Sequence, residues 1–144
     1  MTLRRLAGAA LVLALACPVV PTQAWAAPAP AATRALLQPP LPVDALPGQV
    51  ERACRIWEGL GWPTNPRPVD FRIPGPEFIR GGNPYGNRSG DLPSGGAYHE
   101  YDVNPRPTPT THRDAERLVR DEATVQVWYT ADHYGDFREI SEGC

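Results

Sequence analysis

The chain has 144 residues, and its 14 basic residues, all arginines, face 16 acidic residues, so its formal net charge at pH 7 is −2. This balance excludes a protein that binds polyanions through a broad basic surface, and any contact with nucleic acid must rely on arginines placed locally. No apolar run reaches the ~18 residues that a membrane-spanning helix needs, which favours a soluble product.

Residues 1–26 have the pattern of a secretory signal peptide. A pair of arginines precedes an apolar run from Leu6 to Ala16, and small residues at 24 and 26 form a cleavage site. We expect the mature chain to start near Ala27 and to be secreted, with no membrane attachment once the signal is removed. Lipid attachment through Cys17 and twin-arginine export are weaker alternatives. Without the signal, 12 arginines face 16 acidic residues, and the mature charge is near −4.

The mature chain keeps two cysteines, Cys54 and Cys144, because the third lies in the signal. In an oxidising compartment an even pair predicts a disulfide. Closing so long a loop contributes about 4 kcal/mol in the chain-entropy model. Two unrelated buried thiols are the alternative.

Residues 27–47 are rich in alanine and proline and predict a disordered leader. The domain is then expected over 48–144, and it opens with an amphipathic helix from Gly48 to Gly61. Apolar residues recur there with helical spacing, at Val50, Ala53, Cys54, Trp57 and Leu60.

Proline and glycine dominate residues 63–96, where we predict one short strand, Val69–Ile73, and a long connection. After Gly96 the pattern indicates consecutive strands, at 97–103, 117–120, 124–130 and 136–140. One helix followed by strands predicts an α+β fold in which an N-terminal helix packs on an antiparallel sheet.

Strand alternation sorts the side chains of residues 98–103 onto two faces. Tyr98, Glu100 and Asp102 share one face, and His99, Tyr101 and Val103 the other, where packing in the core is their expected role. A histidine on a later turn, His133, could meet Glu100 as an acid/base pair. Core periodicity also predicts packing roles for three aromatic residues, namely Trp57, Trp128 and Phe137.

Several short motifs stand in one order along the C-terminal two thirds of the chain: Tyr85-Gly86-Asn87-Arg88, Leu92-Pro93, Tyr98-His99-Glu100-Tyr101, Glu122-Ala123-Thr124, Thr130-Ala131-Asp132-His133-Tyr134 and Phe137. In order and spacing they resemble the guanyl-specific microbial ribonucleases, a family that includes barnase. The similarity covers about Leu46 to Cys144. It implies the microbial ribonuclease fold, and single-stranded RNA as substrate.

The resemblance also implies roles for residues. Glu100 would be the general base for the 2′-hydroxyl and His133 the acid for the leaving 5′-oxygen, which yields a 2′,3′-cyclic phosphate without metal or cofactor. Arg113 and Arg117 would stabilise the charge that the phosphate gains, with Arg106 or His112 as alternatives to Arg113. Substrate contacts would come from the recognition loop and its neighbourhood, at Tyr85, Asn87, Arg88, Ser89 and Tyr134. A monomer and a barstar-like protein inhibitor are further implications.

A metal site is the competing interpretation of the histidines. His99-Glu100 begins like a zinc-protease motif, but no second histidine stands four residues on, and His112 and His133 lack ligand spacing. We therefore predict no metal.

The sequence departs from the family pattern at Ser89, where relatives carry a glutamate that accepts hydrogen bonds from guanine. A hydroxyl is a weaker acceptor, and losing a charge-assisted pair costs about 1.5–3 kcal/mol. Asp91 is a possible substitute. An RNA- or protein-binding module with little turnover is therefore the main alternative to an enzyme. A structural envelope protein is a third, supported only by the proline-rich leader.

Overall fold

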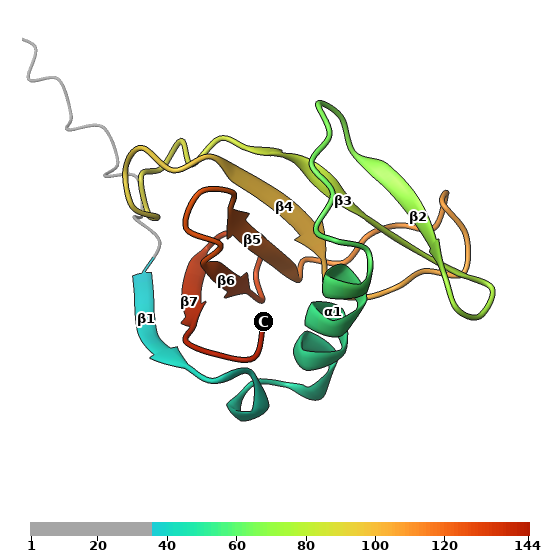
Figure 1. Cartoon of the computed structure of the whole chain (residues 1–144), viewed down its shortest axis with the longest axis horizontal. Helices are drawn as coiled ribbons and strands as arrows, with labels where there is room; N and C mark the ends of the chain where they lie inside the picture. The colour runs from blue at the N-terminus through green and yellow to red at the C-terminus, as the bar shows by residue number, and fades with distance from the viewer. Residues whose placement is uncertain (1–35) are drawn as a thin grey trace, which may run out of the picture. The chain divides into compact units, whose positions relative to one another are not determined.

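The computed structural model describes residues 36–144, in which one seven-stranded sheet and one α-helix occur (Figure 1). The elements in chain order are β1 (Leu36–Leu41), the 3₁₀ helix η1 (Val43–Ala45), α1 (Gly48–Gly59), β2 (Val69–Ile73), β3 (Glu77–Tyr85), β4 (Tyr98–Asp102), β5 (Arg117–Asp121), β6 (Val127–Thr130) and β7 (Asp136–Ile140). The predicted signal peptide and the first part of the predicted leader lie outside the described residues.

Sheet order is β1-β7-β6-β5-β4-β3-β2, so every neighbour pair from β2 to β7 is consecutive in the chain. These pairs are antiparallel, whereas β1 runs parallel to β7. The α+β prediction is confirmed, and the predicted antiparallel pairing holds from β2 to β7, but the parallel strand β1 makes the whole sheet mixed. No hairpin joins β1 to β7. The direction of β1 depends on a contact between the two ends of the domain, which local sequence patterns do not reveal.

Strand β1 corrects the predicted disordered leader, because residues 36–47 are ordered and the domain begins before Gly48. Prolines 39 and 40 are tolerated because β1 is an edge strand, where a missing N–H breaks no ladder. Gln38 hydrogen-bonds Asp136 and Arg138, and Nη1 of Arg138 donates to the carbonyl of Pro39 over 2.9 Å. Side-chain contacts thus replace part of the backbone ladder.

The predicted connection that contains residues 81–93 is wrong for residues 81–85, which belong to strand β3. Two glycines interrupt the β pattern, but Gly81 is needed there because a Cβ would lie 2.7 Å from the Tyr101 ring and 2.9 Å from the Trp57 ring. Gly82, at φ +88°, lies where the β3–β4 register shifts by one residue. Tertiary packing therefore accounts for glycines that resemble loop residues.

The remaining elements agree with prediction to within a few residues, and β2 and β7 match at both ends. The largest difference is at β6, which was predicted from Thr124 and begins at Val127. The backbone N–H of Asp121 donates to the carbonyl of Gln126 over 2.9 Å, and Val125 has a φ of +59°. A turn therefore replaces the first residues of the predicted strand.

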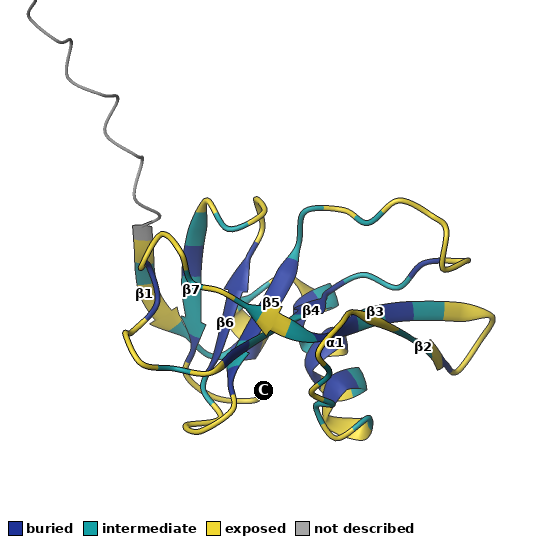
Figure 2. Ribbon diagram, turned by 90° about the horizontal axis from the view of Figure 1, so that it is seen from above, coloured by how far each residue is buried: buried dark blue, intermediate teal, exposed yellow. Residues whose placement is uncertain are grey.

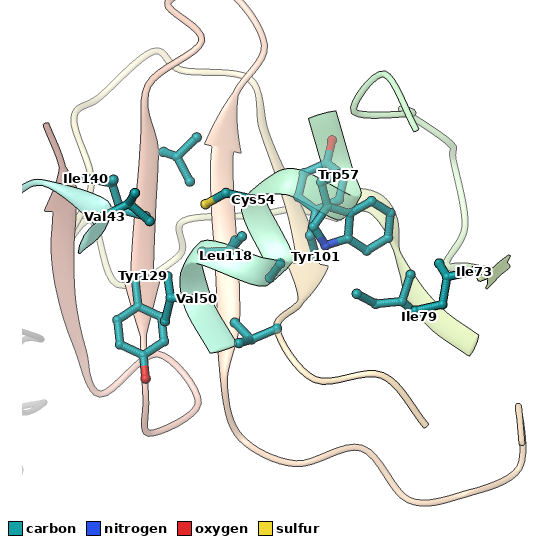
Figure 3. Close-up of a cluster of buried hydrophobic side chains, with 13 residues drawn as sticks. Val43, Val50, Cys54, Trp57, Ile73, Ile79, Tyr101, Leu118, Tyr129 and Ile140 are labelled. Atoms are coloured by element: carbon teal, nitrogen blue, oxygen red, sulfur yellow. The ribbon is translucent and has the colours of Figure 1, made fainter. Parts of the chain in front are cut away.

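Helix α1 contributes its apolar stripe to the larger of two buried clusters (Figure 3). Trp57 is fully buried against Tyr101, and its Nε1 donates to the backbone carbonyl of Asp102 over 2.8 Å. The predicted disulfide is confirmed, because Cys54 of α1 is bonded to Cys144, with the two Cα atoms 5.0 Å apart. Figure 1 shows the C-terminus beside α1, as this bond requires.

A second, smaller cluster contains Leu92, Tyr98, Val119, Trp128 and Phe137. Leu118 and Val119 are consecutive on β5 and belong to different clusters, which places the two clusters on opposite faces of the sheet. Figure 2 shows the central strands β4, β5 and β6 as the most buried part of the sheet. The predicted packing roles of Trp57, Trp128, Phe137 and Tyr101 are confirmed.

His99 departs from its predicted role in the core. Its side chain is only partly buried, its Nδ1 lies 2.8 Å from the carbonyl oxygen of Gly82, and its Nε2 lies 3.6 Å from Glu122.

Among residues 36–144, no helix has the length and apolarity to cross a membrane.

Candidate active site

Glu100 stands in the middle of β4, on the face opposite α1. Its side chain is 13% exposed, and it lies 3.7 Å from Nη2 of Arg113. The same guanidinium group is 2.5 Å from Asp102, two residues further along β4. Alternation along the strand thus places both carboxylates on one face, as predicted.

Asp102 is the buried centre of a cluster of three arginines, which we call the arginine cluster. It is 2% exposed and lies within ion-pair distance of three guanidinium groups, those of Arg106, Arg113 and Arg117. Burial raises the pKa of the Asp102 carboxyl, and the three arginines, Arg113 foremost, act against that rise. One buried anion thus holds the two arginines that the resemblance assigns to the phosphate.

The environment of Arg106 differs from that of Arg113, and this difference shows which of the two cations lies beside Glu100. It is buried, its Nη1 donates to the carbonyls of Pro109 and Thr111, and its Nη2 donates to Asp70. The hydrogen bond from Arg80 lowers the pKa of Asp70. Arg113, and not Arg106, therefore lies next to Glu100.

Arg113, Arg117 and His133 line one cleft of about 680 Å³, together with Arg80, Arg106 and residues 109–115. Arg117 is 3% exposed, and its Nη1 donates to the carbonyl of Glu116 over 2.6 Å. His112 lines the same cleft at an exposed position. The structure thus brings three of the four predicted catalytic residues into one basic cleft, which we call the arginine cleft.

His133 is presented by a tight turn between β6 and β7. It is exposed and has a φ of +59°, and its neighbour Tyr134 has a φ of +75°. The Oδ1 atom of Asp132 accepts hydrogen bonds from the Thr130 hydroxyl and from the backbone N–H groups of residues 135 and 136, at 2.8–3.0 Å. This carboxylate closes the turn and stabilises the left-handed backbone at His133.

Tyr134 joins the histidine turn to the general-base candidate. Its hydroxyl donates to Oε2 of Glu100, and its ring lies 4.7 Å from the ring of His133. Burial, and next the hydrogen bond to Glu100, raises the pKa of Tyr134, so the hydroxyl stays protonated as a donor. Tyr134 also packs against Tyr85, with ring centroids 4.9 Å apart.

A neighbouring cleft of about 640 Å³, the base cleft, contains Glu100 and all five residues predicted to contact substrate: Tyr85, Asn87, Arg88, Ser89 and Tyr134. Arg88 and Ser89 are exposed at its rim. Both side-chain amide atoms of Asn87 bond the backbone of Leu92, at 2.9 and 3.1 Å. Asn87 therefore shapes the loop with its side chain, and its backbone carbonyl accepts a hydrogen bond from the N–H of Gly90 over 3.0 Å.

Asp91, the possible substitute for the family's glutamate, does not line the base cleft. It is 4% exposed and lines a separate cleft with Leu92 and Tyr98. The roles of Asp70, Asp102 and Asp132 were not predicted from the sequence. For Asp102, its position on the same strand face as Glu100 was the available signal.

No group of three or more His, Cys, Asp or Glu side chains is placed to hold a metal ion in the described part of the chain.

A family model described as ribonuclease matches residues 29–141. The chain is 39% identical over 69 residues to guanyl-specific ribonuclease Sa3 from Kitasatospora aureofaciens, a match that covers 46% of this chain and 48% of the relative. It is 39% identical over 70 residues to guanyl-specific ribonuclease Sa of the same organism, covering 46% of this chain and 70% of the relative. The match thus spans about half the length of Sa3.

Among solved structures, ribonuclease Sa2 with guanosine-2′-cyclophosphate is similar at 24% identity with a TM-score of 0.47, over 76% of this chain and 99% of that one. A second Sa2 structure, with exo-2′,3′-cyclophosphorotioate, is similar at 26% identity with a TM-score of 0.46, over the same shares. Because the family model extends over most of the chain, from the segment before β1 to the end of β7, this protein belongs to the ribonuclease family.

Proposed function

We propose that this protein is an endoribonuclease that cleaves single-stranded RNA by transphosphorylation and leaves a 2′,3′-cyclic phosphate. The observation that carries the proposal is the position of Glu100 between the base cleft and Arg113 of the arginine cleft. A nucleotide seated in the base cleft would place its ribose beside Glu100 and its 3′-phosphate beside Arg113 and Arg117. Membership of the ribonuclease family supports this assignment.

The chemistry follows from these positions. Glu100 accepts the proton of the 2′-hydroxyl, the 2′-oxygen attacks phosphorus, and the bond to the 5′-oxygen breaks as His133 donates a proton to it. Both groups are then in the protonation states required for the second step, in which His133 takes a proton from water and Glu100 returns one to the 2′-oxygen. The side chains described here supply every proton, and the step needs no other reactant than RNA and water.

Arg113 and Arg117 stabilise the charge that accumulates on the phosphate oxygens. Because Asp102 and neighbouring carbonyls already hold both guanidinium groups, little reorganisation is needed when substrate binds. A bound arginine fork also matches phosphate geometry better than a mobile lysine.

Guanine is the base that the names of the relatives suggest for the base cleft. We propose cleavage after guanosine with reduced discrimination, because Ser89 is an exposed hydroxyl in place of the family's glutamate. Backbone groups of residues 86–89 would supply the remaining contacts to the base.

The test uses the purified mature chain with RNA and with DNA, each in the presence of a chelator. RNA should be cut to products with 2′,3′-cyclic phosphate ends, and DNA, which lacks the nucleophile, should stay intact. Glu100→Gln and His133→Ala should each lower kcat by about 10²–10⁴. Cleavage of DNA, loss of activity with chelator or full activity in both variants would contradict the mechanism. Mapping of the 3′ ends on a defined RNA measures the base preference.

A second candidate function is RNA or protein binding with little turnover. The buried ion pairs favour it, since Asp70 and Asp102 neutralise part of the arginine cluster, and Ser89 weakens base recognition. This candidate predicts saturable RNA binding without any cyclic-phosphate product.

We further propose that the protein is secreted and monomeric, and that α1 packs on the sheet as in the microbial ribonuclease fold. The signal-like residues 1–26 support export, and the Trp57–Asp102 hydrogen bond supports the helix position. The arginine cleft is a suitable surface for an acidic, barstar-like inhibitor. Fractionation of the producing culture and size-exclusion chromatography with and without such an inhibitor test these points.

A further inference from the structure

A third cleft, which we call the Asp91 cleft, adjoins the base cleft. It has a volume of about 610 Å³ and shares residues 85–87 with the base cleft. Its other lining residues come from the loop before β4, from Tyr98 at the start of β4, and from β1, where Leu37 is exposed at the rim. Glu100, Tyr134, Arg113 and His133 do not line it. The two clefts are therefore neighbours on either side of residues 85–87.

Asp91 is a carboxyl group in the wall of this cleft that lacks a hydrogen-bond partner in the part of the chain that the structure describes. It is 4% exposed, and neither carboxylate oxygen has a hydrogen-bond partner among residues 36–144. A buried carboxylate without donors costs several kcal/mol, so an unpaired one in a cleft wall indicates a ligand that supplies them. The carboxylates of Asp70 and Asp102, in contrast, are surrounded by arginines.

Hydrogen bonds and ring packing hold the surrounding loop in place, so Asp91 does not belong to a loosely held segment. Asn87 bonds both backbone groups of Leu92, the residue after Asp91. The hydroxyl of Tyr98 donates to the carbonyl of Pro93 over 2.6 Å, and the Tyr98 ring packs on Trp128. The backbone that follows Asp91 is thus fixed before any ligand arrives.

The lining determines which ligand chemistry fits. Tyr85, Leu92 and Tyr98 provide aromatic and apolar surface, and the glycines at 86, 90, 95 and 96 expose backbone. A carboxylate accepts two parallel hydrogen bonds from a planar edge with two adjacent N–H donors. Among RNA bases, guanine has such an edge, with N1–H beside the 2-amino group, whereas adenine and cytosine have one amino group and uracil one imino N–H.

The direction of the RNA strand then places the ligand. On the proposed mechanism, Glu100 acts on the ribose that precedes the cleaved bond and His133 on the nucleotide that follows it. The Asp91 cleft adjoins the base cleft and lacks the residues around the phosphate, so it lies towards the 5′ side of the substrate. We propose that the Asp91 cleft is a second base subsite, in which Asp91 binds the guanine of the nucleotide 5′ to the recognised one. This inference rests on the proposed function.

The kinetic test compares GpGpA with UpGpA and uses GpA, which is too short to reach the Asp91 cleft, as the reference rate for each variant. In the wild type, kcat/KM for GpGpA should exceed that for UpGpA by about tenfold or more, the effect of a charge-assisted pair. Asp91→Asn should bring this ratio near one. Asp44→Asn, which removes the same charge from an exposed position in η1, should keep the wild-type ratio. Equal rates for both trinucleotides in the wild type would overturn the subsite.

Binding of non-cleavable 2′-deoxy forms of the same trinucleotides separates this inference from the proposed function. If the wild type cleaves none of the RNA substrates, the proposed function fails. The subsite then stands only if the deoxy GpGpA form binds about tenfold tighter than the deoxy UpGpA form, and only if Asp91→Asn removes the difference. Equal affinities would overturn it.

Thermal unfolding gives an independent check. Because Asp91→Asn removes an unpaired buried charge, the free variant should be at least as stable as the wild type. A clear loss of stability would mean that the carboxylate already has a partner within the chain. That result would overturn the subsite proposal.

Discussion

The Nε atom of Arg113 donates a hydrogen bond to Oδ1 of Asp102 over 2.7 Å, and the same guanidinium group reaches to within 3.7 Å of Glu100. Two carboxylates on one face of β4 therefore share one arginine. The buried carboxylate holds the cation, and the partly exposed one is left to act on substrate. Arg117 approaches the same Asp102 oxygen to 3.5 Å, so the positions of both arginines depend on this buried anion.

Asp102→Asn should damage both stability and catalysis. The substitution leaves three guanidinium groups around a neutral amide, and breaking a buried ion network from one side costs about 3–5 kcal/mol. We expect that loss in urea unfolding, and a lower kcat because Arg113 and Arg117 lose their common anchor. Asp114→Asn is the matched control, since Asp114 is exposed beside Arg117 and should cost no more than about 1 kcal/mol. Equal effects of the two substitutions would argue against the anchoring role.

Asp132→Ala should lower kcat with little effect on KM. Without its Oδ1 acceptor, the turn loses three hydrogen bonds, and His133 has no support for its positive φ. We expect kcat to fall about tenfold or more, because the poorer positioning of His133 should cost about as much free energy as the loss of one or two hydrogen bonds. Asp132→Asn keeps the Oδ1 acceptor and should recover most of the rate. Steady-state kinetics on a dinucleotide would show this pattern, and wild-type kcat in the alanine variant would contradict it.

The Asp70–Arg80 pair should contribute stability only above acidic pH. Its hydrogen bond with Arg80 lowers the pKa of Asp70 below the ordinary value of 3.8, so the unfolded chain binds the proton more readily than the folded one. The contribution is complete above about pH 5 and is lost as the pH falls through the folded-state pKa, below 3.8. The difference in unfolding free energy between wild type and Asp70→Asn should therefore be largest above about pH 5 and should shrink as the pH falls below 3.8. A difference that is constant with pH would refute this linkage.

Removal of the disulfide should be the most destabilising change outside the active site. The bond joins residues 90 positions apart, and its loss in a Cys54→Ala, Cys144→Ala double variant should cost about 4 kcal/mol. For a domain of this size the melting temperature should fall by about 15 °C or more. Wild type in reducing agent is the matched control and should melt near the double variant. Unchanged melting in reducing agent would show that the bond contributes little.

Much of the candidate site could be predicted because its signals are local or depend on order along the chain. Alternation on one strand is sufficient to place Glu100 with Asp102 and to turn Tyr101 towards the core. Motif order was sufficient to select His133, Arg113 and Arg117, which the structure brings to one cleft. The disulfide followed from cysteine count and compartment.

The elements that were missed depend on contacts between distant segments. Local propensity argues against a strand at Gly81-Gly82, and only the rings of Trp57 and Tyr101, packed over Gly81, explain its place in β3. In the same way the prolines of β1 suit a strand only because that strand is at the sheet edge, beside β7.

By itself, the sequence determined the α+β class, the cysteine pairing and the choice of Arg113, Arg117 and His133, which line one cleft, since these depend on periodicity, composition and motif order. Tertiary structure alone decided that Asp102 anchors Arg113 and Arg117, that Arg106 is used to build the loop, and that Asp91 is buried without a hydrogen-bond partner among residues 36–144. The physical reason is that burial and charge pairing depend on which segments meet in space. The sequence does not show whether a carboxylate is solvated, paired with a cation or buried without a partner.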